Sequence, residues 1–309
     1  MLESAGFEIS LSRRNALYAL WGAALLELSE GGPRAFASNP SEPTTSIDRR
    51  WLDLPATPSL PPASDQAVVE LNGTPLFFCQ FGKGADVLLL HGGLANSNYW
   101  GFQVSKLAQH FRVTVMDTRG HGRSAVASDL FGYAQFARDV VALLKHLGIS
   151  KSAVVGWSDG AITGIQLALT RPDLISGLFA FGANTNLQGL IAGGANTKVF
   201  RLFSERCRRE YLSLSPHPER WSRLRSGLVS MWRSQPTFTK SQLSGIAIPV
   251  MIADGEHEEI IRPEHTREIS TQIPHAQLSI MKGVSHFALL QDPAQFNAQL
   301  LQFLSSVLP

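Results

Sequence analysis

Short apolar runs alternate with longer segments of helical apolar spacing over most of this chain. Residues 136–147 and 161–169 show the helical spacing, and each lies between two of the short runs. This alternation predicts a mostly parallel central sheet with helices on both faces. The pair Asn72-Gly73 is a strong hairpin signal and adds an antiparallel edge. The predicted strands are residues 68–71, 76–81, 87–90, 113–116, 153–156, 178–181, 250–253 and 278–281.

The alternation stops at about residues 184–245, where helical spacing continues without a strand run. We interpret this stretch as a helical lid inserted into the sheet domain. Its residues 198–240 carry ten Lys and Arg against three Glu. Two interpretations of that charge are open. The basic residues are solvated helix faces, or their positive potential draws anionic substrates or a membrane surface.

The N-terminal residues 1–37 have the pattern of an export signal. Ser12-Arg13-Arg14 precedes a short apolar stretch, and Ala35-Phe36-Ala37 provides a small-x-small cleavage site. The arginine pair resembles a twin-arginine signal, which predicts an exported, periplasmic or secreted protein. An amphipathic N-terminal helix is the alternative. The apolar stretch is too short for a transmembrane span, so we expect none in the mature chain.

Residues 38–66 are rich in proline, serine and threonine, and we expect an extended tether before a folded domain at residues 67–309. Whether Trp51 and Leu52 dock on that domain is left open. The length of 309 residues allows either two domains or one α/β domain with an insertion. The alternation favours the second.

Composition excludes two broad classes. With 44% hydrophobic residues and a net charge of +2, the chain is neither disordered nor a typical nucleic-acid binder. Cys79 and Cys207 are too few for a disulfide framework, and we expect two buried thiols, with a single bridge as the alternative. No metal or organic cofactor is implied, because neither metal-ligand spacing nor a phosphate-binding glycine loop occurs.

Ser158 is the candidate nucleophile. It stands in Gly156-Trp157-Ser158-Asp159-Gly160, which matches G-x-S-x-G. Alone this motif is weak, but here it follows a predicted strand and opens a predicted helix. That setting places a serine on a strained elbow with its hydroxyl exposed.

A serine hydroxyl needs a base, and the base needs an orienting acid. His286 lies in the loop between the last strand and the last helix, where an imidazole can reach the ends of the central strands. The acid follows the strand at 250–253. Glu258 is favoured by its position three residues after Gly255, while Asp254 and Glu259 are the alternatives.

The glycines of His91-Gly92-Gly93-Leu94 follow an earlier strand and can expose backbone N–H groups. We expect the amide of Gly93, or of Leu94, to form an oxyanion hole with the amide of Asp159. Leu94, Trp157 and Asp159 are also the candidate substrate-binding residues.

Taken together, these motifs resemble the α/β-hydrolase superfamily over residues 67–309. The resemblance also includes Asp117 to Ser124, an Arg-Gly-His-Gly-x-Ser element that is structural in that family. The residues 156–160 and 181–184 look like those of biphenyl-hydrolase-like and valacyclovir-hydrolase-like esterases. Glu258 departs from that pattern, which has Asp. The resemblance implies an α/β-hydrolase fold and a serine esterase with a small-molecule ester substrate.

The resemblance leaves other functions open. A carbon–carbon bond hydrolase or an enol-lactone hydrolase would use the same three residues. A non-catalytic binding protein on this scaffold is a further alternative. In the resembling esterases an acid after the nucleophile suits an α-amino ester, and Asp159 has that position. Its plainer interpretation is an acid that stabilises the start of a helix.

Overall fold

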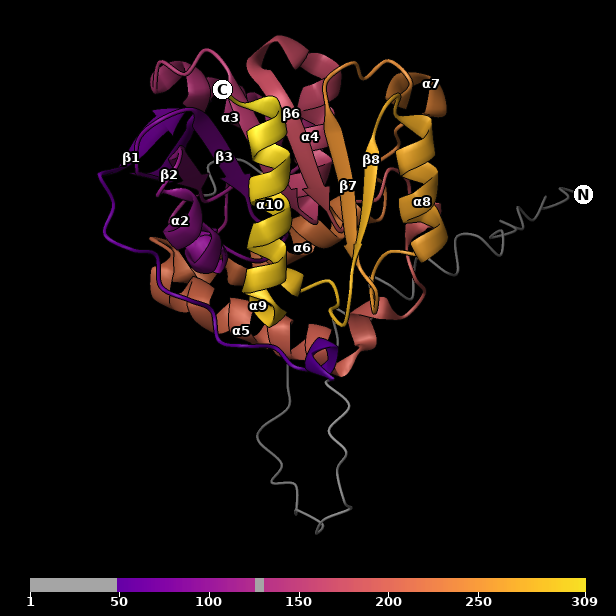
Figure 1. The fold of residues 1–309 in the computed structure, drawn as a ribbon. Coiled ribbons are helices and arrows are strands. Elements are labelled where there is room, and N and C mark those ends of the chain that lie inside the picture. Colours follow the sequence, from indigo (N-terminus) through magenta and orange to yellow (C-terminus); the bar gives the residue numbers. More distant parts are fainter. Residues whose placement is uncertain (1–48, 126–130) are drawn as a thin grey trace, which may run out of the picture.

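The computed structural model describes residues 49–125 and 131–309. In this part of the chain, eight strands form one sheet in the order β1-β2-β4-β3-β5-β6-β7-β8 (Figure 1). The predicted signal at 1–37 lies outside the described residues. The strands are β1 (Asp65–Leu71), β2 (Thr74–Phe81), β3 (Asp86–Leu90), β4 (Arg112–Met116), β5 (Ser152–Trp157), β6 (Ile175–Phe181), β7 (Val250–Gly255) and β8 (Gln277–Met281).

The direction of the strands agrees with the sequence prediction. β1 and β2 form an antiparallel hairpin, and β2 also pairs antiparallel with β4. The remaining neighbours from β4 to β8 are parallel. The hairpin turns at Asn72 and Gly73, which have positive φ angles of 50° and 68° as a tight turn requires.

Helices cover both faces of the sheet. The helices α2 (Gly101–Leu107) and α10 (Pro293–Val307) pack together on one face, while α3 (Tyr133–His146) and α4 (Asp159–Thr170) pack together on the other (Figure 1). The two layers bury the central strands completely, since every residue of β5 is buried. Parallel strands covered on both faces read as continuous apolar runs, which is why the sequence located them.

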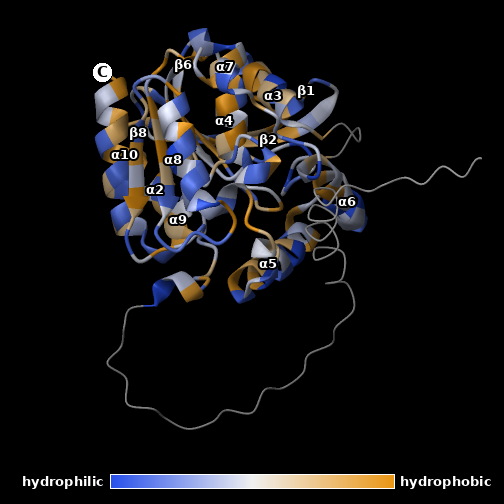
Figure 2. Cartoon of the chain, turned by 90° about the vertical axis from the view of Figure 1, so that its right-hand side faces the viewer, coloured by the Kyte–Doolittle hydropathy of each residue, from blue (hydrophilic) through white to orange (hydrophobic). Residues whose placement is uncertain are grey.

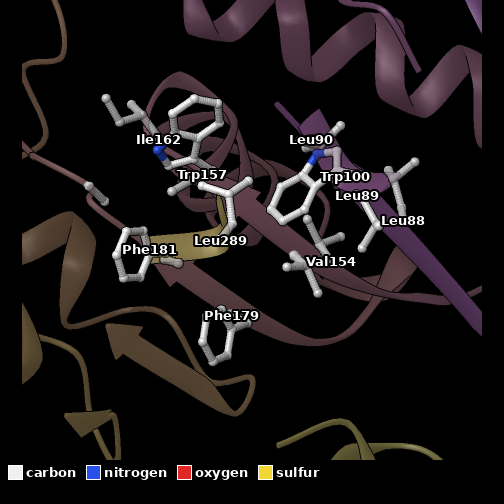
Figure 3. Close-up of a cluster of buried hydrophobic side chains, with 14 of the residues drawn as sticks. Leu88, Leu89, Leu90, Trp100, Val154, Trp157, Ile162, Phe179, Phe181 and Leu289 are labelled. Atoms are coloured by element: carbon white, nitrogen blue, oxygen red, sulfur yellow. The ribbon is translucent and has the colours of Figure 1, made fainter. Parts of the chain in front are cut away.

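The core is aromatic where the strands end. Figure 3 shows Trp157 and Phe181, at the ends of β5 and β6, near Leu289 of α9 (Ala288–Gln291). Trp157 and Phe181 are at most 1% exposed. This packing fixes the last residues of two strands and therefore the loops that follow them.

The segment between β6 and β7 contains α5 (Lys198–Leu214), α6 (Trp221–Trp232) and α7 (Lys240–Leu243). α5 and α6 lie beyond one end of the sheet (Figure 1), and we call residues 184–245 the lid. The helix α8 (Pro263–Gln272) follows β7 and packs against it.

The described part of the proline-rich segment does not stand apart from the domain. Residues 49–64, here called the strap, are an extended chain after the short turn at Arg50–Leu52. Leu54, Leu60 and Ala63 pack against the hydrophobic core. An extended tether was predicted for 38–66 with its docking left open, and these apolar side chains give the strap a surface to bury.

Cys79 and Cys207 are free, buried thiols. The Tyr99 hydroxyl lies 3.5 Å from the Cys207 sulfur. No helix within the described ranges 49–125 and 131–309 combines the length and the apolarity that crossing a bilayer requires.

Candidate active site

Ser158 occupies a strained turn between β5 and α4. Its φ and ψ of 55° and −120° lie in a region that side-chain-bearing residues rarely adopt. The two flanking positions must be glycine, because there is no room for a side chain. A Cβ on Gly156 would lie 2.4 Å from the nitrogen of Ala161, and one on Gly160 would lie 2.0 Å from the oxygen of Leu90. The sequence therefore forms a sharp elbow that leaves Ser158 half-buried at a pocket.

His286 lines the same pocket and is held on two sides. Its Nδ1 lies 2.9 Å from Oε2 of Glu258, and both side chains are at most 3% exposed. Trp157 donates its indole N–H to the carbonyl oxygen of His286 at 2.8 Å. With Nδ1 donating to Glu258, Nε2 of the neutral imidazole is the nitrogen that can accept a proton.

Of the three candidate acids, Glu258 is the one whose carboxylate meets the imidazole. Its other oxygen, Oε1, accepts N–H groups from Ile260 and Ile261 at 2.7 and 3.1 Å. Asp254 is buried and instead accepts the hydroxyl of Thr266 at 2.6 Å. Glu259 accepts the backbone N–H of His286 at 3.2 Å. The structure thus places Glu258 on the ring and Glu259 on the backbone of the histidine.

Burial shifts the pKa values of both partners in opposite directions. It lowers the pKa of His286 below its ordinary value, against the opposing charges of Glu259 and Asp254. It raises the pKa of Glu258, against hydrogen bonds that include the amides of Ile260 and Ile261. A histidine with a lowered pKa is neutral at pH 7, which is the form that a general base needs.

The two expected oxyanion donors border the same pocket. Gly93 and Asp159 both line it, and Asp159 is the first residue of α4. The N–H groups in the first turn of a helix have no partner within the helix, so the Asp159 amide is available to a ligand. Leu94 is buried with a φ of 65° and is not among the lining residues. The pocket geometry therefore favours Gly93 over Leu94.

The hydrogen bonds of the Asp159 side chain show that it does more than stabilise the start of the helix. Its Oδ1 accepts the hydroxyl of Tyr133 at 2.8 Å, and its Oδ2 accepts the indole N–H of Trp232 at 2.9 Å. Burial raises the pKa of Asp159 to about 6, although these two donors oppose the rise. A carboxyl group with neutral donors only is costly to ionise in an apolar pocket.

The pocket lies between the strand ends and the lid. The strand-end side consists of Gly92, Gly93, Trp157, Ser158, Asp159, Asn184, Ile260, Ile261 and His286. The opposite side consists of Tyr133 from α3 and of Leu190, Phe200, Phe203, Trp232 and Gln235 from the lid.

Comparisons with known proteins agree with this fold. A family model described as the alpha/beta hydrolase fold matches residues 87–193, which include the elbow and the Gly93 loop. The chain belongs to the α/β-hydrolase superfamily. It is a hydrolase of that fold.

Two curated relatives of this hydrolase match most of its length. A pimeloyl-[acyl-carrier protein] methyl ester esterase of Nitrosospira multiformis is 24% identical, over 74% of this chain and 97% of the relative. A non-heme haloperoxidase of Rhodococcus erythropolis is 26% identical, over 77% and 99%. Among solved structures, the enol-lactonase from Burkholderia xenovorans superimposes with a TM-score of 0.63 at 22% identity, covering 77% of this chain and 100% of the enol-lactonase.

The structure of the hydrolase brings Ser158, Asp159, Gly93, Trp157 and His286 to one pocket, with Glu258 directly behind the histidine. The lid's basic side chains do not join them. Within the described residues, no Lys or Arg lines this pocket. The lid charge therefore offers no contact to an anionic substrate at the pocket wall.

Sequence reasoning missed the residues that enclose the pocket. Tyr133 opens a helix whose apolar spacing indicates only core packing, and nothing in the spacing of Phe200 or Phe203 separates a pocket wall from a buried helix face. Trp232 lies in the predicted lid, but its contact with Asp159 joins residues 73 positions apart. Such contacts depend on how the lid packs.

The strap contacts the loops that carry His286 and Glu258. The ring of Trp51 stacks on His257, with centroids 3.8 Å apart, immediately before Glu258. Gln291 donates to the carbonyl oxygen of Asp53 at 2.9 Å and accepts the N–H of Ser285 at 2.7 Å. The strap thus supports the loops that carry His286 and Glu258 from outside the pocket.

Among the described residues, no group of three or more His, Cys, Asp or Glu side chains is arranged to hold a metal ion.

Proposed function

We propose that this hydrolase cleaves carboxylic esters through an acyl-enzyme intermediate on Ser158. The observation that carries the proposal is the pair formed by His286 and Glu258, held at 2.9 Å beside a serine on a strained elbow in one pocket. The curated relative that acts on a methyl ester supports the same bond type. Glu258 takes the place of the aspartate in this arrangement and orients the imidazole.

In the first step Nε2 of His286 takes the hydroxyl proton as the Ser158 oxygen bonds to the ester carbonyl carbon. The carbonyl π bond breaks, and the amides of Gly93 and Asp159 stabilise the oxyanion. The oxyanion then re-forms the carbonyl as the alcohol leaves with the proton from His286. Water completes the cycle by the same proton transfers and releases the carboxylic acid.

Ser158→Ala tests the proposal. The variant should lose hydrolysis of p-nitrophenyl acetate to near background, with an unchanged circular dichroism spectrum. Ser285→Ala is a control for the loss of a serine hydroxyl next to His286, because the Ser285 hydroxyl bonds Gln291 and Glu259 and does not line the pocket. A fluorophosphonate probe should label the wild type and not Ser158→Ala. Absence of labelling in the wild type would identify a non-catalytic binding protein and overturn the proposal.

Carbon–carbon bond and enol-lactone hydrolysis would use the same three side chains. The fold shared with the enol-lactonase is compatible with them. Substrates of these reactions that carry a carboxylate would meet Asp159 and no described Lys or Arg in the pocket. The pocket therefore favours neutral or cationic substrates.

The Asp159 carboxylate makes an α-amino ester the specific substrate class that we propose. It lies on the pocket wall beside the nucleophile, with Trp232 and Tyr133 holding it in place. An ammonium group would supply the positive charge that these neutral donors lack.

Comparing an α-amino ester with its des-amino analogue tests this class. The wild type should prefer the amino ester above about pH 6, where Asp159 ionises, and lose the preference below it. Asp159→Asn should show no preference at any pH. If the wild type and Asp159→Asn preferred the amino ester equally, the ammonium site would be rejected and the esterase proposal would stand.

We also propose that the protein is exported, because Arg13-Arg14 and the cleavage site at Ala37 retain the pattern of a twin-arginine signal. Replacing both arginines with lysine should leave the hydrolase in the cytoplasm of a bacterial host, as measured by fractionation.

A further inference from the structure

Four of the ten basic residues of the lid lie on one face of α5. Between Lys198 and Lys240 there are ten Lys and Arg against three Glu, whereas acidic and basic residues are nearly balanced over the rest of the described chain. On α5, every residue of one helical stripe is exposed. The stripe consists of Lys198, Arg201, Leu202, Glu205, Arg208, Arg209 and Leu212.

The opposite face of α5 is fixed to the protein. Phe203 and Cys207 are at most 3% exposed, and the ring of Phe203 contacts the rings of Tyr99 and Phe287. Arg206, at the side of the helix, donates to the strap carbonyl of Leu54 at 2.7 Å. The stripe is therefore presented outward by a helix that is anchored along its length. Figure 2 shows α5 at the edge of the molecule, with blue hydrophilic residues beside hydrophobic ones.

Two features make this stripe unusual for a plain solvated face. Leu202 and Leu212 are each 42% exposed within it. Arg208 and Arg209 form no ion pair with any described carboxylate, although Glu205 lies on the same stripe. A solvated helix usually offsets its charges with partners at i+3 or i+4 and keeps leucine off its surface.

We propose that the outer face of α5 docks on an anionic phospholipid bilayer. Its four cations attract anionic headgroups, and long arginine side chains can reach them while their aliphatic stems stay at the interface. The two leucines enter the upper acyl region between the cations. Charge alone would fit a nucleic acid as well, but exposed leucines add nothing to a phosphate backbone.

This docking would place the pocket's cover against the bilayer. Phe200 and Phe203 of α5 face the pocket. They lie on the side of the helix opposite the stripe. The surface is separate from Ser158, so membrane binding and ester cleavage can fail independently.

Vesicle co-sedimentation tests the proposal. The purified chain should sediment with phosphatidylcholine vesicles that contain 30% phosphatidylglycerol, and not with pure phosphatidylcholine. Each basic residue near an anionic surface strengthens binding by roughly fivefold. The triple variant Arg201→Gln, Arg208→Gln, Arg209→Gln should therefore weaken partitioning by about a hundredfold.

A charge-matched control separates the stripe from total charge. Lys83, Lys106 and Lys151 are exposed, and Lys83 and Lys151 lie just before β3 and β5, at the strand ends opposite the pocket. Replacing these three with Gln should leave vesicle binding intact. Leu202→Ser with Leu212→Ser should reduce the binding that persists in 0.5 M salt. Both sets should keep wild-type hydrolysis of a soluble ester.

Three outcomes overturn the proposal. They are equal binding to neutral vesicles, equal loss of binding in the stripe and control variants, and binding to a labelled DNA duplex in preference to the anionic vesicles.

Discussion

The two sides of the pocket differ in how their residues are held. On the strand-end side, backbone geometry places the reactive groups, as in the Ser158 elbow and the two amides on Glu258. On the lid side, aromatic rings such as Phe200 and Phe203 are held by packing with each other. Backbone hydrogen bonds position an atom more precisely than apolar contacts do. In the proposed function, the bond-breaking chemistry therefore belongs to the strand-end wall, and the lid wall shapes the space for the substrate.

Asp159 joins the two sides. Its amide belongs to the strand-end wall, and its carboxylate accepts hydrogen bonds from Trp232 of the lid and Tyr133 of α3. Substitutions on the strand-end wall, on the lid wall and at Asp159 can separate what each part contributes to activity and stability.

The largest effect is expected on the strand-end side. Glu258→Gln removes the charge that stabilises imidazolium and should lower kcat by about 10⁴-fold. Asp254→Asn is the comparison variant, because Asp254 is also buried and bonds Thr266 and Glu258, but does not bond the ring of His286. Its kcat should stay within about tenfold of wild type. Equal losses in the two variants would mean that Glu258 has no special role, as measured with p-nitrophenyl acetate.

At the junction, Asp159→Asn should change stability in a pH-dependent way. Its folded pKa of about 6 lies above the ordinary 3.8, so the folded state holds the proton more tightly. Asp159 therefore favours the folded state at pH 4, where its carboxyl is protonated when folded. This contribution is lost as the pH rises through 6, and at pH 7 the free energy of unfolding is lower by about 3 kcal/mol. Thermal melts should show Asp159→Asn stabilised relative to wild type at pH 7.5 and not at pH 4. A pH-independent difference would contradict the shifted pKa.

On the lid side, Phe200→Leu should alter selection and leave the chemistry in place. The smaller side chain widens the wall, and kcat/KM for a long-chain ester relative to an acetyl ester should change by about tenfold. The kcat for the acetyl ester should remain near wild type. If that kcat fell as far as the selectivity changed, the two walls would not be separable.

Outside both walls, the strap should have the smallest effect. Trp51→Ala removes the ring that stacks on His257 beside Glu258, and we expect about a threefold fall in kcat with KM unchanged. Leu52→Ala is the control, since Leu52 is 49% exposed and lies one residue away. Steady-state kinetics of the two variants should differ only in kcat.

The strand-end wall was largely predictable and the lid wall was not. Periodicity located the strands, and the motifs that follow them placed Ser158 and His286 because parallel strands bring their ends to one edge. The position three residues after Gly255 favoured Glu258 and left Asp254 and Glu259 open, and the structure places the Glu258 carboxylate on the ring of His286. Tyr133, by contrast, comes to Asp159 through the packing of α3 on α4, which no local pattern encodes.

Two expectations depended on forces that a sequence pattern does not weigh. The extended segment expected at 38–66 is extended where it is described, but Leu54 and Leu60 bury against the domain. The lid charge was left open between solvated helix faces and attraction for anionic substrates or a membrane surface, and three of the exposed arginines, Arg201, Arg208 and Arg209, lie on the outer face of α5. In both cases the side that faces the protein was set by tertiary packing.

The strap also bears on how the molecule is made. It joins the start of the described chain to its end, since Gln291 bonds Asp53 238 residues away and Arg50 pairs with Asp292. A ribosome delivers the strap long before its partners. The newly made N-terminal segment must therefore wait for nearly the whole chain to emerge, and an enzyme shortened at its C-terminus would lose the support of both catalytic loops at once.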